Sequence, residues 1–398
     1  MKILFVNSLY YPNVVGGAER SLQLLAESLA AAGEEIVVLS TDDETHSGMV
    51  NGVRVYYVRS PNLYWMRTAK SQPAYKKPLW HMIDSYNPRV RPIVSDIIAK
   101  EKPEILHTNN LAGLSVAVWH AARDHRLPIV HTIRDHYLLC ARGLMYHKGR
   151  ECEPRCGYCR ALAWPRRRAA RLVDAVVGVS RFILDKHLRF GYFANTCLQT
   201  HIYNSVGIAA QGRRRRRTTD DFVFGYVGQL APAKGIEFLL QRFKRLNKPG
   251  TRLRVFGRAL NEAYVRMLRE QYGGRSVEFL GHCAIEDVYP AVDTVVIPSL
   301  CDDAFPRTLI ESYSFGVPVI ATTRGGAAEM LVEGETGFLF DPGREGDIED
   351  RLSRMADTPE LVEQFAPACL KVASELTGEL VVQRYRETYQ TVLTGYLR

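Results

Sequence analysis

The most constraining stretch of this 398-residue chain runs over 295–321, where strand, loop, helix and strand follow one another closely. The β-branched run 295–297 is typical of a buried strand. The pattern then predicts a short helix over 307–315 and, after a Gly-Val-Pro turn, a second strand over 317–321. Strands that alternate with helices in this way predict a parallel sheet with helices on its faces.

Two carboxylates, Asp303 and Glu311, bracket the loop and the start of this helix. The first N–H groups of a helix carry partial positive charge, so the stretch suits an anion such as a diphosphate. A carboxylate in the helix can accept hydrogen bonds from a ribose diol, and one in the loop can accept them from sugar hydroxyls. The alternative interpretation is a helix cap followed by an ordinary surface Glu.

The surrounding sequence is longer than a cap requires, because DAFPRTLIE is followed by GVPVIAT, GGAAE and GETGFLF. These segments resemble the Glu-x7-Glu signature and its flanks in family 4 of the retaining glycosyltransferases, and the resemblance covers nearly the whole chain. It implies an α/β protein of GT-B fold, with two Rossmann-like doubly wound domains facing a cleft. One residue departs from the pattern, because Asp303 stands where the family usually has Glu.

The resemblance implies that the second domain binds a nucleotide-sugar donor. Glu311 is expected to bind the ribose and Asp303 the sugar hydroxyls. Lys234 lies in a loop similar to the family's Gly-Arg-Leu-x3-Lys-Gly and is expected to stabilise the leaving diphosphate, helped by the amides near Arg307 and Thr308. The remaining donor-binding residues expected on this basis are Gly16, Gly17, Phe305 and Gln229, the last standing where the family has Arg.

Two segments of the first domain are also candidates for the site. Gly16 and Gly17 follow a predicted strand at 2–7 and precede a predicted helix, so their backbone can approach a phosphate closely, although a tight turn is an alternative. The segment HTIRDHYLLCARG follows a predicted strand at 128–132, where open parallel sheets place ligands. The resemblance implies catalytic roles for Asp135, which matches a family Asp, and for Arg134, which stands where the family often has His.

Other residues could take over the part of that missing His. His131 and His136 lie close by in the sequence, and for both a purely structural role is an equal alternative. The less regular stretch 59–92, rich in Tyr, Trp, Pro and Lys, is of a length that is usually functional or mobile, and its place in the first domain favours acceptor binding.

Four of the eight cysteines fall within twenty residues: Cys140, Cys152, Cys156 and Cys159. Four soft ligands at short spacing suit tetrahedral zinc, although the spacing is not one of the standard paired knuckles. Structural zinc and four free thiols are both open interpretations, since a cytosolic location would disfavour disulfides. No other cofactor is expected.

The length predicts two domains, because a single core rarely grows to this size. The sequence predicts a first domain at 1–206, a linker at 207–221 that lacks apolar periodicity, and a second, nucleotide-sugar-binding domain at 222–378. A last helix at about 379–398 carries an apolar stripe and is expected, from the resemblance, to pack back on the first domain. The stripe consists of Val382, Tyr385, Tyr389 and Val392.

Positive charge is concentrated in the first half of the chain. Residues 1–217 hold 32 Lys and Arg against 17 Asp and Glu, whereas the remainder holds 20 against 26. Clusters at 76–77, 166–168 and 213–217 fit an anionic membrane surface or nucleic acid, and no nucleic-acid-binding motif accompanies them. With no signal peptide and no apolar run long enough for a membrane span, a cytoplasmic protein, peripheral on the membrane, is expected.

The resemblance implies transfer of a sugar from a nucleotide-diphosphate sugar to a hydroxyl of a glycan or lipid-linked glycan. Retained anomeric configuration, no catalytic metal and a place in cell-surface polysaccharide synthesis are further implications. Two alternatives stay open: a non-catalytic nucleotide-sugar-binding partner of a true transferase, and another GT-B enzyme such as an epimerase or a phosphorylase.

Overall fold

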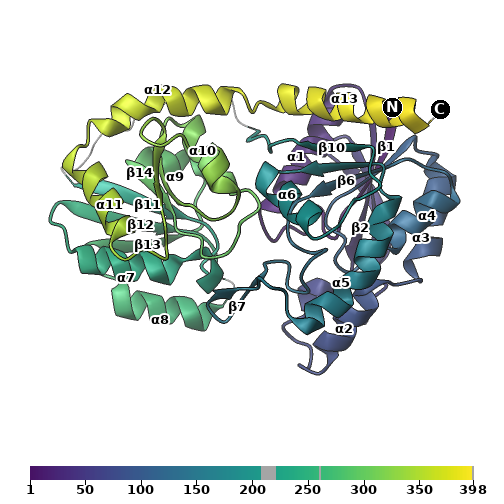
Figure 1. The fold of residues 1–398 in the computed structure, drawn as a ribbon, viewed down its shortest axis with the longest axis horizontal. Helices are drawn as coiled ribbons and strands as arrows, with labels where there is room; N and C mark the ends of the chain where they lie inside the picture. The colour runs from purple at the N-terminus through teal and green to yellow at the C-terminus, as the bar shows by residue number, and fades with distance from the viewer. Residues whose placement is uncertain (208–220, 260, 397–398) are drawn as a thin grey trace. The chain divides into compact units, whose positions relative to one another are not determined.

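The computed structural model describes residues 1–207, 221–259 and 261–396 (Figure 1). The predicted linker and its arginine run at 213–217 therefore lie almost wholly outside the described residues. The chain divides into two compact units. The first comprises Met1–Met145, Cys152–Ser205 and Gly378–Arg398, and the second comprises Tyr146–Glu151 and Val206–Thr377.

The first unit contains an eight-stranded sheet in the order β10-β9-β6-β5-β1-β2-β4-β3. Neighbouring strands are parallel except at one edge, where β3 runs antiparallel to β4. The strands are β1 (Lys2–Val6), β2 (Glu35–Asp42), β3 (His46–Val50), β4 (Val53–Arg59), β5 (Ile105–Thr108), β6 (Ile129–Ile133), β9 (Ala175–Gly178) and β10 (Leu198–His201). Apolar β-branched residues dominate the central strands, as burial on both faces of a parallel sheet requires.

The helices of the first unit are α1 (Gly17–Ala31), α2 (Lys76–Ser85), α3 (Val90–Glu101), α4 (Ala117–Asp124), α5 (Gly157–Ala169), α6 (Arg181–Arg189) and α13 (Gly378–Tyr396). The last of these is the predicted terminal helix, and its stripe of Val382, Tyr385, Tyr389 and Val392 is buried in the same core as β1 and α1. Tyr389 also anchors the helix through its hydroxyl, which lies 2.7 Å from Nδ1 of the buried His107 on β5.

The second unit is built on a six-stranded, fully parallel sheet in the order β13-β12-β11-β14-β15-β16. Its strands are β11 (Phe222–Val227), β12 (Thr251–Phe256), β13 (Val277–Gly281), β14 (Thr294–Ile297), β15 (Val319–Thr322) and β16 (Gly337–Phe340). Its helices are α7 (Ile236–Leu246), α8 (Glu262–Tyr272), α9 (Ile285–Val288), α10 (Arg307–Ser314), α11 (Asp347–Asp357) and α12 (Leu361–Ser374). A short hairpin of β7 (Tyr146–His147) and β8 (Arg150–Glu151) belongs to this unit although it comes from the middle of the first.

The prediction for the stretch 59–92 needs correction. The stretch 59–92 contains a regular helix, α2, because its Trp80 and Asp84 are buried while Pro78 lies in the first turn, where a missing N–H is tolerated.

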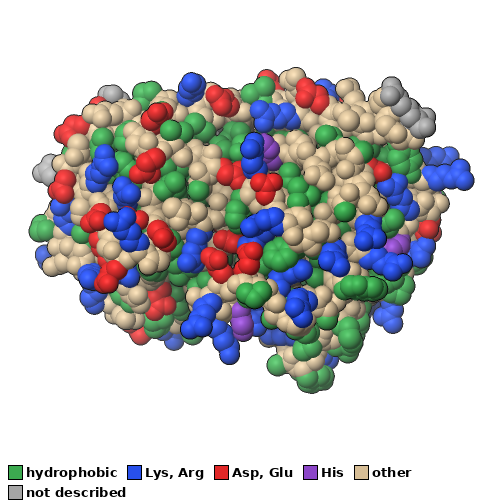
Figure 2. All heavy atoms as spheres, in the orientation of Figure 1, with side chains coloured by type: hydrophobic (Ala, Val, Ile, Leu, Met, Phe, Trp, Pro, Cys, Tyr) green, Lys and Arg blue, Asp and Glu red, His purple; other side chains and the backbone are tan. Residues whose placement is uncertain are grey.

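Most large apolar side chains are buried, and the exposed ones are unevenly distributed. Figure 2 shows hydrophobic side chains gathered at the lower end of the face in view, over the part of the first unit where Figure 1 places α2. Among the helices of the described residues, none is both long and apolar enough to cross a membrane.

Candidate functional site

In the second unit, two loops leave the sheet where its strand order reverses. β11 lies between β12 and β14, so the chain builds outward in both directions from the β11 and β14 pair. Open parallel sheets bind ligands at such a point, beyond the carboxyl ends of the strands. The loop after β11 leads through a 3-10 turn, η3 (Pro232–Lys234), and the loop after β14 carries Asp303.

Lys234 and Asp303 form an ion pair across these two loops, in which Lys234 Nζ donates to Asp303 Oδ2. The side chains keep 28% and 20% of their surface exposed, so a ligand can reach them. Burial disfavours the charged ammonium, but the negative charge of Asp303 outweighs this, and the pKa of Lys234 is raised above its ordinary value. Lys234 is therefore charged at neutral pH.

Backbone contacts fix the two loops against each other. The amides of Leu300 and Cys301 both donate to the carbonyl of Ala233, at 3.0 and 3.1 Å. Gly235 has φ +72°, and a Cβ there would lie 1.8 Å from the carbonyl oxygen of Pro298. Because a larger residue would force the loops apart, the glycine sets the separation of Lys234 from the end of β14.

Glu311 is held from two sides within α10. Its Oε2 accepts a hydrogen bond from the hydroxyl of Tyr289 at 2.8 Å, and its Oε1 is 3.1 Å from Nη2 of Arg307. Glu311 as a whole is 9% exposed. A carboxylate has about four acceptor positions, so Glu311 keeps capacity for a further donor such as a sugar hydroxyl.

The start of α10 brings the remaining predicted donor-side residues together. Arg307 and Thr308 are the first two helical residues after Pro306, and the amide of Leu309 donates to the carbonyl of Pro306 at 3.1 Å. Phe305 is buried just before the helix. Pro306 has no N–H to offer, so the positive end of the helix is formed by the amides that follow it.

Gln229 lies in the same loop as Lys234 but is fixed through its backbone. Its carbonyl accepts from the hydroxyl of Tyr226 at 2.7 Å and from the amide of Ala231 at 2.9 Å. The residue brings no charge to the site, so Lys234 is the cation that this loop supplies.

In the first unit, Gly16 and Gly17 form the start of α1, which follows the end of β1. Glu19, in the first turn, bends back so that its Oε2 accepts from the amide of Gly16 at 2.8 Å. The N-terminal end of α1 thus already binds the carboxylate of Glu19. A donor phosphate that used the same amide would have to replace Glu19.

Arg134 and Asp135 follow β6 and are both anchored by asparagines. Nε of Arg134 donates to Oδ1 of Asn109 and its Nη1 donates to Oδ1 of Asn204, each at 2.7 Å. Oδ2 of Asp135 accepts from Asn110 Nδ2 at 2.5 Å. Burial raises the pKa of Asp135 to about 6, although a hydrogen bond from the amide of Tyr137 opposes this. Asp135 is therefore close to its titration range at neutral pH.

The two alternative histidines are both buried in the first unit. Nδ1 of His131 lies 2.9 Å from the hydroxyl of Thr108, and burial lowers the pKa of His131 to about 3. The ring of His136 is stacked with that of His187, with centroids 6.3 Å apart. Both rings are packed as core residues, which favours a structural role.

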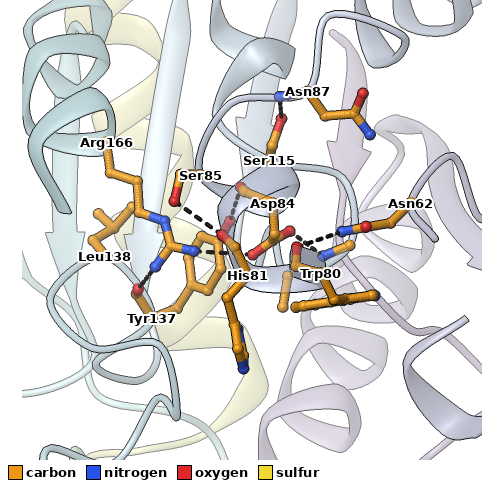
Figure 3. A network of polar contacts seen from close by, with 12 residues as sticks. Asn62, Trp80, His81, Asp84, Ser85, Asn87, Ser115, Tyr137, Leu138 and Arg166 are labelled. Atoms are coloured by element: carbon orange, nitrogen blue, oxygen red, sulfur yellow. Dashed lines mark hydrogen bonds and ion pairs between the residues drawn. The ribbon is translucent and has the colours of Figure 1, made fainter. Parts of the chain in front are cut away.

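A buried ion pair supports the segment that carries Asp135 (Figure 3). Nη2 of Arg166 on α5 contacts Oδ2 of Asp84 on α2 at 3.0 Å, with both side chains at most 1% exposed. Nη1 of Arg166 donates to the carbonyl of Tyr137 at 2.6 Å, and the guanidinium lies 4.1 Å from the centre of the Tyr137 ring. Arg166 thus holds the backbone two residues after Asp135.

Two family models together account for most of the chain. Residues 16–202 match the glycosyl transferase 4-like domain, and residues 210–371 match the glycosyl transferases group 1. The chain belongs to the group 1 glycosyltransferases. It is also 33% identical, over 83% of its length and 87% of the other protein, to an uncharacterized 42.6 kDa protein in the cps region of Klebsiella pneumoniae.

Solved structures place the glycosyltransferase in the GT-B fold. Sucrose-phosphate synthase from Thermosynechococcus elongatus has a TM-score of 0.78 at 18% identity, with 99% of each chain covered. HepE from Anabaena, solved in complex with UDP, has a TM-score of 0.72 at 21% identity, covering 98% of this chain and all of that one. The predicted glycosyltransferase family and the GT-B fold with two parallel-sheet domains are thus confirmed.

The four clustered cysteines of the glycosyltransferase lie in the first unit. Sγ of Cys140 and Sγ of Cys159 are 4.0 Å apart, and the amide of Cys159 donates to Sγ of Cys156 at 3.4 Å, which caps α5. Burial raises the pKa of Cys152, and the neighbouring Cys140 and Cys156 contribute to the same effect. Within the described ranges, no three His, Cys, Asp or Glu side chains are arranged to hold a metal ion, so zinc here stays a prediction.

Sequence reasoning missed two residues of the donor-side loops. The hydroxyl of Tyr289, the residue after α9, donates to Glu311. Only the position of Tyr289 before a buried strand could have suggested this contact. Nη1 of Arg324 donates to the carbonyl of Leu300 at 2.7 Å and contacts Glu151 Oε1 at 3.3 Å. Arg324 directly precedes the segment GGAAE, whose adjacent glycines were the signal.

Proposed function

We propose that this glycosyltransferase moves a sugar from a nucleotide-diphosphate sugar to a hydroxyl of a glycan or lipid-linked glycan, with retention of the anomeric configuration. The observation that carries the proposal is the convergence of Lys234, Asp303 and the start of α10 at the reversal point of one sheet. Such a site combines a fixed cation, helix amides and a carboxylate, which are the groups that a diphosphate and a sugar need.

Each part of the donor would be bound by a different residue or group of residues. Glu311, oriented by Tyr289 and Arg307, would accept hydrogen bonds from the ribose. Lys234 and the first amides of α10 would bind the diphosphate, and Asp303 would bind the sugar hydroxyls. Because Asp303 already pairs with Lys234, donor binding would insert the phosphate beside the ammonium and turn Asp303 toward the sugar.

In the reaction, the bond between the anomeric carbon and the diphosphate oxygen breaks, and a bond to the acceptor oxygen forms. The hydroxyl proton of the acceptor is released, and the nucleoside diphosphate leaves. Negative charge that develops on the diphosphate would be stabilised by Lys234 and the α10 amides, so we propose that no catalytic metal is required.

The first unit would serve the acceptor. Asp135, whose pKa of about 6 leaves it mostly ionised at neutral pH, could accept a hydrogen bond from the acceptor hydroxyl. Arg134, oriented by Asn109 and Asn204, would bind an anionic part of the donor or acceptor. The cps-region relative supports a role in cell-surface polysaccharide synthesis. We further propose a cytoplasmic location.

HepE, solved with UDP and with UDP-glucose, supports a uridine nucleotide as the first donor to test. A panel of nucleotide-sugars should include one that raises the unfolding temperature, since about 2.7 kcal/mol of stabilisation is expected at a hundredfold excess over Kd. NMR of the product formed with an acceptor should then show the donor's anomeric configuration retained.

Three outcomes separate the alternatives. Stabilisation by a nucleotide-sugar without release of nucleoside diphosphate on any acceptor extract would favour a non-catalytic partner. Nucleoside diphosphate released without acceptor would favour an epimerase-type enzyme. An inverted product would contradict the retaining mechanism.

A further inference from the structure

The outer face of α2 is apolar although it faces solvent. Tyr75, just before the helix, and Leu79 and Met82 within it follow each other at spacings of four and three residues, so they share one side of the helix. They are 77%, 42% and 59% exposed. The opposite side buries Trp80 and Asp84, so this helix has apolar residues on both of its sides.

The neighbouring α5 continues this surface. Its Trp164 is 59% exposed on the side away from Leu162 and Arg166, which are buried, and Tyr158, near the start of the helix, is 46% exposed. The hydroxyl of Tyr158 donates to the carbonyl of Pro78 in α2 at 3.4 Å, and Arg166 pairs with Asp84 beneath. The two helices therefore pack side by side, and we call their exposed residues together the α2–α5 face.

The charge around this face has a single sign. Residues 60–83 contain four Lys and Arg and no Asp or Glu, and residues 157–172 contain five Lys and Arg and no Asp or Glu. Arg166 is turned inward, which corrects the predicted cluster at 166–168, but Arg160, Arg167, Arg168 and Arg171 are exposed. An amphipathic surface whose charged residues in these two stretches are all basic complements an anionic one.

A small hollow of about 110 Å³ lies on α5 and shows what chemistry the surface suits. It is lined by Trp164, Arg167, Arg168 and Arg171. Three guanidinium groups around an indole suit a phosphate ester, because arginine binds phosphate oxygens through paired N–H groups and tryptophan prefers the boundary between water and hydrocarbon. A partner protein would need several carboxylates or phosphates at the same place.

We propose that the α2–α5 face docks the glycosyltransferase on an anionic lipid bilayer. Tyr75, Leu79, Met82 and Trp164 enter the headgroup region, and the arginines of α5 bind lipid phosphates. This docking goes beyond the proposed sugar transfer and uses no residue of the donor site. It would hold the first unit at the surface where a lipid-linked acceptor is found.

Vesicle co-sedimentation without donor or acceptor tests the proposal, so its failure leaves the proposed function untouched. The full chain should bind vesicles that contain phosphatidylglycerol and should not bind pure phosphatidylcholine. Raising the salt from about 0.05 M to about 0.5 M should release it, since screening shortens the range of the charges. Equal binding to neutral vesicles, or no binding to anionic ones, would overturn the proposal.

Two sets of variants locate the surface. The triple change Arg167→Ala, Arg168→Ala and Arg171→Ala should weaken binding about 100-fold, since each cation near an anionic surface contributes about fivefold. Its matched control changes three exposed arginines of the second unit, Arg266, Arg269 and Arg275, to Ala. For the apolar stripe, Leu79→Ser with Met82→Ser should weaken binding about tenfold, whereas Met49→Ser, at 64% exposure elsewhere in the first unit, should not.

Trp164 provides a readout that a protein partner would not produce. Its fluorescence should shift to shorter wavelength on anionic vesicles and be quenched by brominated lipids, and Trp164→Phe should remove the signal. Circular dichroism and an unchanged unfolding temperature check that the variants fold. If the control triple loses as much binding as the α5 triple, or if Trp164 is not quenched while the protein is bound, docking by this face is refuted.

Discussion

At the scale of single residues, the pairing of Lys234 with Asp303 links two groups to which we assign donor chemistry. The family resemblance predicted both residues, but it did not predict that they bind each other. Their contact follows from the reversal of strand order, which brings the loops after β11 and β14 side by side. Sequence spacing does not contain this information, because 69 residues separate the partners.

The charge of Lys234 should therefore depend on Asp303. Burial alone lowers the pKa of a lysine, and the carboxylate of Asp303 reverses this. In Asp303→Asn the burial remains and the negative charge is lost, so we expect the alkaline limb of kcat/KM to move to lower pH. The control Asp302→Asn, next along the chain, should leave that limb in place; a limb that moves equally in both variants would contradict the account.

Other site residues were predicted only in part. Glu311 was identified from the motif, but its partner Tyr289 was not, because a tyrosine before a buried strand looks like a core residue. Glu19 also went unnoticed, although its position two residues after Gly17 makes it a natural partner for the amide of Gly16. The sequence thus identified which kinds of residue form the candidate site, and only the structure showed which of them bind one another.

At the scale of elements, the best-predicted parts are strands, because 4–6 apolar residues bounded by turns have few alternatives in an α/β chain. Helix α2 was missed because Pro78 and its exposed apolar stripe conceal the usual periodicity. The β7–β8 hairpin was missed as well, since each of its strands has only two residues. Its assignment to the second unit rests on tertiary contacts that no local pattern reports.

The Arg166–Asp84 pair should be among the costliest contacts to break in the first unit. Removing one partner of a fully buried pair leaves the other charge uncompensated, so Arg166→Met is expected to cost about 3–5 kcal/mol of unfolding free energy. The exposed pair Arg91–Asp124, at 2.6 Å, is the matched control, and Arg91→Met should cost about 1 kcal/mol or less.

Urea unfolding followed by tryptophan fluorescence measures both variants, since all four tryptophans lie in the first unit. Adding Asp84→Asn to Arg166→Met should recover part of the loss, because the orphaned charge is then gone. Equal losses for Arg166→Met and Arg91→Met would show that the buried pair is not a main support of α2 and α5.

The cysteine segment carries the metal prediction. If Cys140, Cys152, Cys156 and Cys159 bind zinc, the purified, reduced protein should contain about one metal ion per chain. Cys156→Ser should release the ion and destabilise the first unit, whereas Cys197→Ser, exposed and outside the cluster, should do neither. Metal analysis that finds none in the fresh wild-type protein would end the zinc hypothesis.

At the scale of the whole molecule, buried histidines should make the first unit sensitive to acid. Burial lowers the pKa of His81 to about 4 and of His131 to about 3, and it lowers those of His107 and His187 well below the ordinary value. Below a pH of about 6.5 the unfolded chain binds these protons and the folded chain does not. Stability from these groups is therefore present above that pH and is lost as the pH falls.

Two carboxyls act in the opposite direction. Burial raises the pKa of Asp84 and of Asp135 to about 6, so the folded chain holds their protons between about 4 and 6 while the unfolded chain releases them. Four histidines outweigh two carboxyls, and we expect the urea midpoint, followed by tryptophan fluorescence, to fall between pH 7 and pH 5. A midpoint that rises over this range would contradict the sign.

The central claim is that one loop system of the second unit holds both parts of the donor, with Glu311 on the ribose and Lys234 on the diphosphate. The ribose keeps its charge during the reaction, so Glu311→Ala should mainly weaken donor binding and raise KM. The diphosphate gains charge as the glycosidic bond breaks, so Lys234→Ala should mainly lower kcat, by about 10² to 10³.

The most direct test is steady-state kinetics of these two variants with the identified donor, together with donor affinity measured by calorimetry. Lys248→Ala, which breaks the 2.7 Å pair with Asp357, and Glu349→Ala, which breaks the 3.3 Å pair with Arg242, are matched controls of similar exposure. We expect the controls to keep wild-type kcat and KM, Glu311→Ala to lose affinity, and Lys234→Ala to lose turnover. Wild-type kcat/KM in either site variant, or a Lys234→Ala enzyme that loses only affinity, would contradict the account.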